Sequence, residues 1–263
     1  AFDPETGKTL WESVGEKNWQ GQPMIGWRGD PTVDWKRFRH DKQASYSTPV
    51  AATVNGERQI FCLTRQGLVS VKPENGEVNF SYWFRSTVND SVNAMNPVVI
   101  ANDVLVSAAY YKIGAVLLRV LPGNKQVEPV WRSTALEIHF TTPIFHNGYL
   151  YAFSGRNPPD AHFRCVEYKT GRIMWDRDEH WSGYGPEQTY GRGSALMADG
   201  KLIVLGETGI LGIFRVNPEK PEELARYAVP ELKYPCWTAP ILSDKRLYLR
   251  SENKLLCFDF ARQ

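Results

Sequence analysis

Six residues, spread at long intervals along the chain, have side chains that could together bind a small molecule. Each stands within two residues of the start of one of five related stretches of sequence. Aromatic rings can stack on a planar ligand, and amide, imidazole and guanidinium groups can fix its orientation by hydrogen bonds. The six candidates are Tyr46, Asn93, His139, Phe140, Arg192 and Trp237. Whether they meet at one site depends on the elements between them.

The familiar catalytic and metal-binding patterns do not occur in this sequence. The cysteines contain no CxxC pair and no adjacent pair, and the five histidines contain no HxH or HxxxH pair, so we predict neither a metal site nor a catalytic residue. Cys165 and Cys257 occupy equivalent positions in two different repeats. They should therefore lie in different blades, too far apart to form a disulfide bond. We expect free thiols throughout, with both of these buried. The four cysteines are Cys62, Cys165, Cys236 and Cys257.

The composition is typical of an all-β protein. The chain has 263 residues, of which 13% are aromatic, and its 21 glycines and 17 prolines stand between short apolar runs. The net charge of +2 is small and its charges are interspersed, so we predict no nucleic-acid partner. No apolar run approaches the roughly 18 residues of a membrane-spanning helix, so we predict no transmembrane segment.

Two short patterns alternate along the whole chain. The first combines a small residue, an apolar pair, a turn and an apolar strand; it starts at positions 47, 95, 141, 193 and 238, which are 48, 46, 52 and 45 residues apart. The second places a glycine four residues before an aromatic residue, as in Gly7 and Trp11, and in Gly171 and Trp175. Four short strands in each unit of this length predict a β-propeller of four-stranded antiparallel blades.

The blade boundaries follow from these starting points. Because both ends carry a copy of the third-strand pattern, we expect one domain that is a fragment of a 7- or 8-bladed ring; the alternative is a closed five-bladed ring. The predicted segments are a partial blade at 1–13, an insertion loop at 14–46, blades at 47–92, 93–138, 139–190 and 191–235, and a partial blade at 236–263.

The stretch Ala1, Asp3, Thr6, Gly7 and Trp11 has the form AxDxxTGxxxW. It resembles the repeat of quinoprotein-like β-propellers, a class that contains the pyrroloquinoline quinone (PQQ) dehydrogenases and cofactor-free PQQ-repeat proteins such as the propeller lipoprotein of outer-membrane β-barrel assembly. The resemblance implies that the aromatic residue of each repeat docks on the turn of the neighbouring blade as part of a structural girdle. The girdle residues are then Trp11, Phe80, Trp131 and Trp175, with Tyr227 as a further aromatic substitute.

The resemblance also implies a location for the six candidates. In propellers of this class, the residues that precede the first strand of each blade line the mouth of the central channel. In PQQ enzymes a tryptophan there stacks on the quinone, and a Glu, an Asn and an Asp hold Ca²⁺. Trp237 and Asn93 match two of these roles, but no acidic residue stands in the aligned ring. We therefore expect no cofactor; the alternative is PQQ with calcium. The simplest view of the polar residues is that they line a water-filled channel.

The insertion at 14–46 interrupts the regular spacing and is rich in tryptophan and arginine, which are frequent anchors of protein interfaces. Either its tryptophans pack onto the protein's own propeller or they await a partner. The partner-loop candidates are Trp19, Trp27, Trp35, Arg37 and Arg39.

We therefore predict a non-catalytic β-propeller scaffold that binds proteins or a small ligand in the periplasm or another extracytoplasmic compartment. Protein partners would meet the face that bears the insertion. The alternative is a PQQ-dependent alcohol or sugar dehydrogenase. Both the compartment and the alternative rest on the family resemblance.

Overall fold

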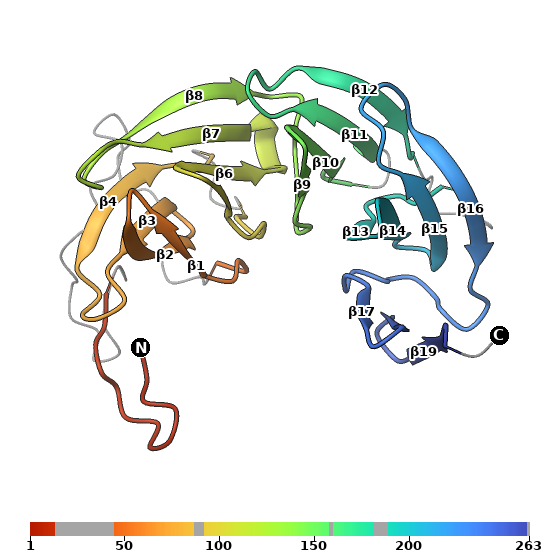
Figure 1. Ribbon diagram of the computed structural model, residues 1–263, viewed down its shortest axis with the longest axis horizontal. Helices are drawn as coiled ribbons and strands as arrows, with labels where there is room; N and C mark the ends of the chain where they lie inside the picture. The colour runs from red at the N-terminus through yellow and green to blue at the C-terminus, as the bar shows by residue number, and fades with distance from the viewer. Residues whose placement is uncertain (14–44, 87–91, 158–159, 181–188, 262–263) are drawn as a thin grey trace. The chain divides into compact units, whose positions relative to one another are not determined.

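The computed structural model describes residues 1–13, 45–86, 92–157, 160–180 and 189–261 (Figure 1). The regular elements of these ranges are almost all strands, and a single-turn 3-10 helix, η2, spans Tyr110–Lys112. All strand pairs are antiparallel, so the predicted all-β fold is confirmed. The chain divides into two compact units, Ala1–Phe140 and Thr141–Gln263.

The first unit contains two four-stranded sheets in which the strands follow one another in chain order. They are preceded by a short hairpin in which Phe2 bridges Thr9. The first sheet consists of β1 (Val50–Val54), β2 (Glu57–Leu63), β3 (Gly67–Val71) and β4 (Val78–Trp83). The second consists of β5 (Val98–Ile100), β6 (Asp103–Ala108), β7 (Gly114–Val120) and β8 (Val127–Ser133).

The second unit contains two more sheets of this kind and a three-stranded sheet. The first consists of β9 (Ile144–His146), β10 (Tyr149–Ser154), β11 (His162–Glu167) and β12 (Ile173–Asp178). The second consists of β13 (Ser194–Ala198), β14 (Lys201–Leu205), β15 (Ile210–Arg215) and β16 (Glu222–Ala228). The last consists of β17 (Ile241–Ser243), β18 (Arg246–Arg250) and β19 (Leu255–Asp259).

The first hairpin of each sheet is closed by a tight turn with positive backbone φ angles. In the β1–β2 turn Asn55 has φ 47° and Gly56 has φ 80°, and Asn147–Gly148 and Asp199–Gly200 repeat this geometry. Such turns match the right-handed twist of the flanking strands, and Asn, Asp and Gly adopt positive φ most readily. Asn55 also reaches the next sheet, because its Nδ2 donates to the carbonyl oxygens of Val120 (3.2 Å) and Leu121 (3.1 Å).

Every four-stranded sheet has a β-bulge at the same place in its outer strand. In β4, Phe80 pairs with Ser70 and Val78 with Val71, so Asn79 is an extra residue. The equivalent extra residues in the other sheets are Val130, Met174 and Leu224. A bulge increases the local twist of a strand, and here it precedes the position predicted for the girdle aromatic.

Neighbouring sheets pack face to face through apolar side chains. In the first unit Phe61 and Leu68 of one sheet share a core with Val104, Val116 and Leu118 of the next. In the second unit, an aromatic core joins β9–β12 to β13–β16, with Phe163 in edge contact with Trp175 and Phe214. Because apolar residues lie on both faces of these sheets, a sheet is covered only when it has a neighbour on each side.

Two tryptophans each donate a hydrogen bond to a turn of the next sheet. Trp11 Nε1 donates to the Pro73 carbonyl oxygen in the β3–β4 turn (3.0 Å), and Trp175 Nε1 donates to the Asn217 carbonyl oxygen in the β15–β16 turn (2.8 Å). Gly76, with φ 72°, leaves room for the Trp11 ring, because a Cβ at this position would lie 2.4 Å from the Trp11 ring. Phe80 and Trp131 are also buried.

Two expectations from the sequence are wrong. Tyr227 is not the girdle residue of its sheet: the register pairs Ala225 with Ile213 at that position, and Tyr227 is 52% exposed. Cys257 is exposed although Cys165 is buried. Each cysteine pairs with a tyrosine on the adjacent strand, Cys165 with Tyr151 and Cys257 with Tyr248. The strand that carries Cys257, however, has no buried residue.

All four cysteines are free thiols. Within the described residues, no helix has the length and apolar character that crossing a membrane would require.

Replacing Trp175 by alanine should lower the free energy of unfolding by about 3–5 kcal/mol, because a large buried ring is removed and a cavity is left. Trp175→Phe should lower the free energy of unfolding by about 1 kcal/mol in addition to any effect of packing, because phenylalanine cannot donate the hydrogen bond to the Asn217 carbonyl oxygen. Urea unfolding at neutral pH measures both. Tyr227→Ala is the matched control and should stay within about 0.5 kcal/mol of the parent protein. Equal midpoints for Trp175→Ala and the parent would show that Trp175 does not hold the two sheets together.

Candidate functional site

The candidates of the first unit begin with Tyr46 and Asn93, which lie beside each other. Tyr46 is 75% exposed, and its backbone N–H donates to the Asn93 carbonyl oxygen (3.2 Å). Asn93 is only 1% exposed, and its Nδ2 donates to the carbonyl oxygens of Thr64 and Phe84, both at 2.9 Å. The amide therefore joins the β2–β3 turn to the segment after β4, and its Oδ1 is buried with no hydrogen-bond partner among the described residues.

His139 and Phe140 belong to a half-buried aromatic cluster at the β6–β7 turn. Tyr110 contacts the His139 ring edge-on at 5.1 Å, and the rings of His139 and Phe140 lie 5.3 Å apart. Next to them Lys112 Nζ forms an ion pair with Glu137 Oε2 at 2.8 Å. The cluster thus combines two predicted candidates, His139 and Phe140, with Tyr110 of the β6–β7 turn, which the sequence analysis did not identify.

The candidates of the second unit, Arg192 and Trp237, meet at the carboxylate of Glu207. Arg192 Nη2 and Trp237 Nε1 donate to Glu207 Oε2 at 2.8 and 3.0 Å, and the Arg192 backbone N–H donates to Oε1 at 2.9 Å. The Arg192 guanidinium also lies over the Trp237 ring, 5.6 Å from its centroid. Glu207 is fully buried, whereas Trp237 is 45% exposed.

Backbone contacts hold this carboxylate in place. Glu207 lies in the β14–β15 turn, where its N–H donates to the Tyr190 carbonyl oxygen (3.0 Å) and its own carbonyl oxygen accepts from the Cys236 N–H (2.9 Å). Gly191 permits the close approach, since a Cβ there would lie 2.5 Å from Glu207 Oε1. Arg192 Nη1 reaches further, to the Arg156 carbonyl oxygen (2.8 Å) in the preceding sheet. The arrangement therefore links three consecutive sheets.

Glu207 is the residue that reasoning from the sequence missed. The sequence argument aligned only residues that precede first strands and found no acid there. In an antiparallel sheet, however, the turn between the second and third strands lies at the same end as the start of the first strand. The Gly-Glu-Thr-Gly turn at 206–209 is the signal that would have revealed the carboxylate.

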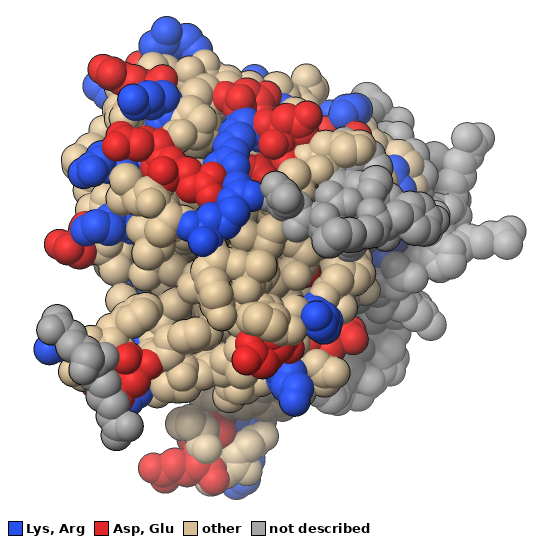
Figure 2. All heavy atoms as spheres, turned by 90° about the vertical axis from the view of Figure 1, so that its right-hand side faces the viewer, with Lys and Arg blue, Asp and Glu red and all other residues tan. Residues whose placement is uncertain are grey.

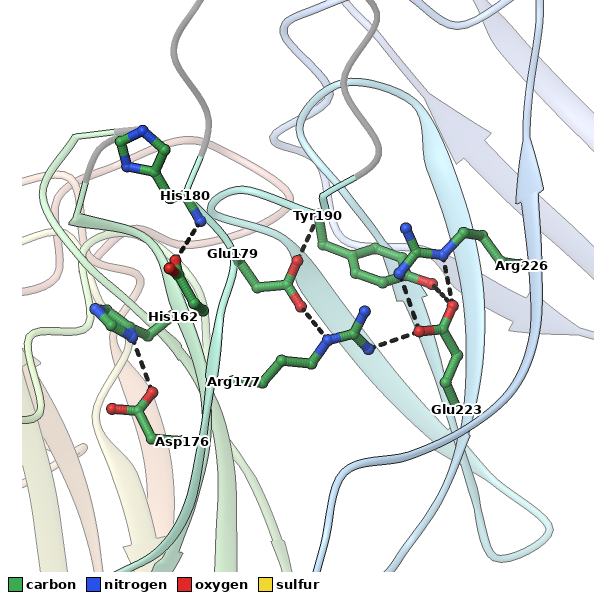
Figure 3. Close-up of polar contacts among 9 residues, drawn as sticks. His162, Asp176, Arg177, Glu179, His180, Tyr190, Glu223 and Arg226 are labelled. Atoms are coloured by element: carbon green, nitrogen blue, oxygen red, sulfur yellow. Dashed lines mark hydrogen bonds and ion pairs between the residues drawn. The ribbon is translucent and has the colours of Figure 1, made fainter.

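A second ionic network joins β12 to β16 (Figure 3). Glu223 is its centre: Arg177 Nη1 lies 2.6 Å from Oε2, Arg226 Nε lies 2.6 Å from Oε1, and the Tyr190 hydroxyl donates to Oε1 at 3.0 Å. Arg177 Nε also lies 2.9 Å from the buried Glu179 Oε1. Arg177 thus lies between the carboxylates of Glu179 and Glu223, and Glu223 lies between Arg177 and Arg226, so the charges form a continuous chain.

Burial and hydrogen bonding shift the two carboxylates of this network in opposite directions. Burial raises the pKa of Glu179, and the hydrogen bond from the Tyr190 N–H and the charge of Arg177 only partly oppose it. Burial also acts against ionisation of Glu223, but the hydrogen bonds from Arg226 and Arg177 outweigh it and lower the pKa of Glu223 to about 2. Glu223 is therefore the ionised centre of the network at neutral pH.

The charges on this face are largely paired. Figure 2 shows a band of basic side chains bordered by acidic ones. In the β15–β16 hairpin, which also carries Glu223, Arg215 and Glu222 form a further pair at 3.1 Å. Paired charges of this kind neutralise one another at close range, so the face is not a simple anion- or cation-binding surface. We regard it as a surface that stabilises the sheet junction.

The described residues contain no group of three His, Cys, Asp or Glu side chains that could hold a metal ion. The partner-loop candidates Trp19, Trp27, Trp35, Arg37 and Arg39 lie outside the described residues, and their role stays a prediction.

Comparison with known proteins identifies the family. The family model described as outer membrane protein assembly factor BamB matches residues 1–177. The chain belongs to this family. Among solved structures, BamB from Moraxella catarrhalis has a TM-score of 0.58 at 11% identity, covering 81% of this chain and 58% of that one. The computationally designed Ika8 protein has a TM-score of 0.56 at 10% identity, covering 91% of this chain and 62% of that one.

These likenesses show a BamB-type propeller fold, and the chain spans less than two thirds of the length of either structure. None of the curated proteins matches the chain.

In this BamB-family chain, the group formed by Glu207, Arg192 and Trp237 does not fit the calcium and quinone site of PQQ enzymes. The carboxylate beside Arg192 and Trp237 already accepts hydrogen bonds from both side chains, and the arginine balances its charge. A Ca²⁺ ion needs several oxygen ligands, and a carboxylate engaged in this way would have to give up its arginine. Trp237 donates its N–H to the same carboxylate, and this hydrogen bond orients the indole ring.

Glu207→Gln should destabilise the protein by roughly 3 kcal/mol or more, because it leaves the buried guanidinium of Arg192 without a counter-charge. Urea unfolding monitored by tryptophan fluorescence is the measurement. Glu252→Gln is the matched control, since Glu252 occupies the same position in the β18–β19 turn but is exposed and should have little effect. A stable Glu207→Gln protein with unchanged Trp237 accessibility to iodide quenching would refute the structural role of this ion pair.

Glu223 should make the protein lose stability as the pH falls from about 4.5 to about 2. Its pKa is lowered in the folded state, so its contribution is complete above the unfolded pKa and disappears as the folded carboxylate becomes protonated. We expect Glu223→Gln to be less stable at neutral pH and to lose less stability in this interval. Unfolding free energies measured between pH 5 and pH 2 test this, and identical pH dependence in the two proteins would contradict it.

Proposed function

We propose that the chain is a non-catalytic β-propeller scaffold that binds protein partners outside the cytoplasm. The observation that carries the proposal is the BamB family match over residues 1–177, the family being named for assembly of outer membrane proteins. A protein of that role needs a rigid body with exposed interaction surfaces rather than a reaction centre. The partners would be proteins of the bacterial envelope that take part in such assembly.

The contacts of Glu207 and of Asn93 support the non-catalytic part of the proposal. General acid–base or metal chemistry needs a carboxylate that is free to exchange protons or ligands. Glu207 is instead saturated by Arg192 and Trp237, and Asn93 uses its amide N–H groups on the backbone of neighbouring turns. The polar residues at this end of the sheets thus support the junctions between them. The rival function, PQQ-dependent oxidation of an alcohol or sugar, has no such support from the side chains.

Crosslinking in cells that export the protein tests the scaffold role. We expect a short amine-reactive crosslinker to join the chain to envelope proteins, and mass spectrometry to identify the same partners in repeated preparations. A rigid scaffold should give links concentrated on a limited surface. Links only within the chain itself would contradict the proposed function.

Titration with PQQ and Ca²⁺ is the control that separates the rival. A scaffold should show no saturable quinone absorbance and no dye-linked oxidation of alcohols or sugars. Saturable binding accompanied by turnover would replace the scaffold proposal by the dehydrogenase.

A further inference from the structure

Asparagine followed by glycine occurs three times in this chain, at Asn55–Gly56, Asn75–Gly76 and Asn147–Gly148. This pair is chemically reactive, because glycine has no Cβ to hinder its backbone nitrogen when that nitrogen approaches the side-chain carbonyl carbon of the asparagine. The three pairs have different surroundings in the folded protein. These surroundings determine which of the pairs can react.

The first pair is protected because the side chain of Asn55 is held in place. Its Nδ2 donates to the carbonyl oxygens of Val120 and Leu121 at 3.2 and 3.1 Å, and to Asn124 Oδ1 at 3.0 Å. An attack by the Gly56 nitrogen requires the amide to turn away from these acceptors. The reaction at this pair therefore has to break three hydrogen bonds before it begins.

The second pair is protected because the backbone nitrogen of Gly76 is engaged and covered. Its N–H donates to the Lys72 carbonyl oxygen at 2.9 Å. Gly76 is buried beneath the Trp11 ring, from which a Cβ at this position would lie only 2.4 Å away. Asn75 Oδ1 in turn accepts a hydrogen bond from the Glu77 N–H at 2.9 Å. Both reacting groups of this pair are thus held in other contacts.

The third pair has neither kind of protection. Asn147 is exposed, and among the described residues neither its side chain nor the Gly148 N–H forms a hydrogen bond. The hairpin that the pair closes is also short, since three residue pairs join β9 to β10 whereas five join β1 to β2. A short ladder with few contacts opens locally at a low cost in free energy. A small movement of this turn can therefore bring the two groups together.

The equivalent turn of the next sheet shows that a carboxylate is compatible with this position. Asp199, followed by Gly200, closes the β13–β14 hairpin, and its φ of 47° equals that of Asn147. The Asp199 side chain is 96% exposed. Conversion of Asn147 to aspartate therefore leaves a turn of a kind that the fold already contains.

We propose that Asn147 is a site of spontaneous covalent modification, at which the folded protein forms aspartate and isoaspartate while Asn55 and Asn75 stay intact. The Gly148 nitrogen forms a bond to Asn147 Cγ, the Cγ–Nδ2 bond breaks, and ammonia leaves with the proton of the Gly148 amide. Water then opens the resulting cyclic imide. Cleavage of its N–Cγ bond gives aspartate, and cleavage of its bond to the main-chain carbonyl carbon gives isoaspartate. No oxidant or reductant takes part.

The isoaspartate product should disturb the structure more than the aspartate product does, because its main chain runs through the side-chain carbon and is longer. The Gly148 carbonyl oxygen accepts a hydrogen bond from the Tyr168 N–H at 2.9 Å, and the Tyr168 ring contacts Phe145 edge-on at 5.1 Å. A longer turn displaces that carbonyl group. We therefore expect faster amide hydrogen exchange at Tyr168 in the isoaspartate form than in the unmodified protein.

The test follows the three asparagines in one sample of the folded chain, kept in mildly alkaline buffer below its melting temperature. Digestion at low pH and mass spectrometry then measure how fast each asparagine is converted. We expect the rate at Asn147 to exceed the rates at Asn55 and Asn75 by at least about tenfold, which corresponds to a barrier difference of about 1.4 kcal/mol. In the chain unfolded by urea, the three rates should be similar, because the protecting contacts are absent.

Equal rates at Asn147 and Asn55 in the folded protein would overturn the proposal. It would also fail if Asn147 stayed unmodified in the folded protein over a period in which the unfolded chain reacts. Both outcomes are measured relative to asparagines of the same molecule, so differences in buffer or handling cannot produce them.

Methylation by a protein-isoaspartate methyltransferase with labelled S-adenosylmethionine gives a second measurement. Asn147→Ala should lower the label taken up by the stored folded protein by at least about tenfold. Alanine suits this turn, because Ala101 has φ 52° at the equivalent position of the β5–β6 turn. Asn75→Ala is the matched control and should leave the uptake unchanged. Undiminished uptake in Asn147→Ala would place the isoaspartate elsewhere and refute the assignment.

Discussion

Each four-stranded sheet of this chain has apolar side chains on both faces, and the need to cover both determines the rest of the structure. Val104, Val116 and Leu118 are fully buried only because another sheet lies against them. Burial of this kind contributes roughly 25 cal/mol per Å² of apolar surface, but it has no direction and would tolerate sliding of one sheet over another. Directional contacts at the sheet ends are therefore needed to set the register between neighbours. Asn55 at one junction and Trp175 at another provide such contacts, since each donates from its side chain to a backbone carbonyl of the next sheet.

Charged groups serve the same purpose where the chain buries them. Glu207 and Glu179 lie at the ends of strands, and each is held by an arginine and by a backbone N–H. A buried ion pair adds little net stability compared with apolar packing, but breaking one is costly. These pairs therefore act mainly by disfavouring arrangements of the sheets in which the pairs are broken. At Arg192 and Trp237, for example, the side-chain donors are engaged by Glu207 within the protein.

The fold was predictable because it follows from local patterns that repeat. Glycine and asparagine at the hairpins, and apolar strands at intervals of 45–52 residues, allow little else than stacked antiparallel sheets. The wrong predictions concern properties that depend on the register of strand pairing or on which side chains lie nearby in the folded protein. The bulge in β16 shifts the girdle position to Ala225, which spacing alone placed at Tyr227. Cys165 and Cys257 share a repeat position but not the same cover. Glu207 was missed because its partners, Arg192 and Trp237, come from segments 15 and 30 residues away that only the folded sheets bring together.

A repeat protein can build the same junction in more than one way. At the Trp11 junction a tryptophan ring lies over Gly76, whose positive φ and missing Cβ leave room for it. The β7–β8 turn departs from this pattern, because Lys125 stands at the glycine position and the positive φ angles lie at Gly123 and Asn124. A turn rebuilt in this way cannot form a copy of the Trp11 contact. Its sheet is connected to the preceding one by other directional contacts, between Lys125 and Glu77 and between Arg132 and Tyr82.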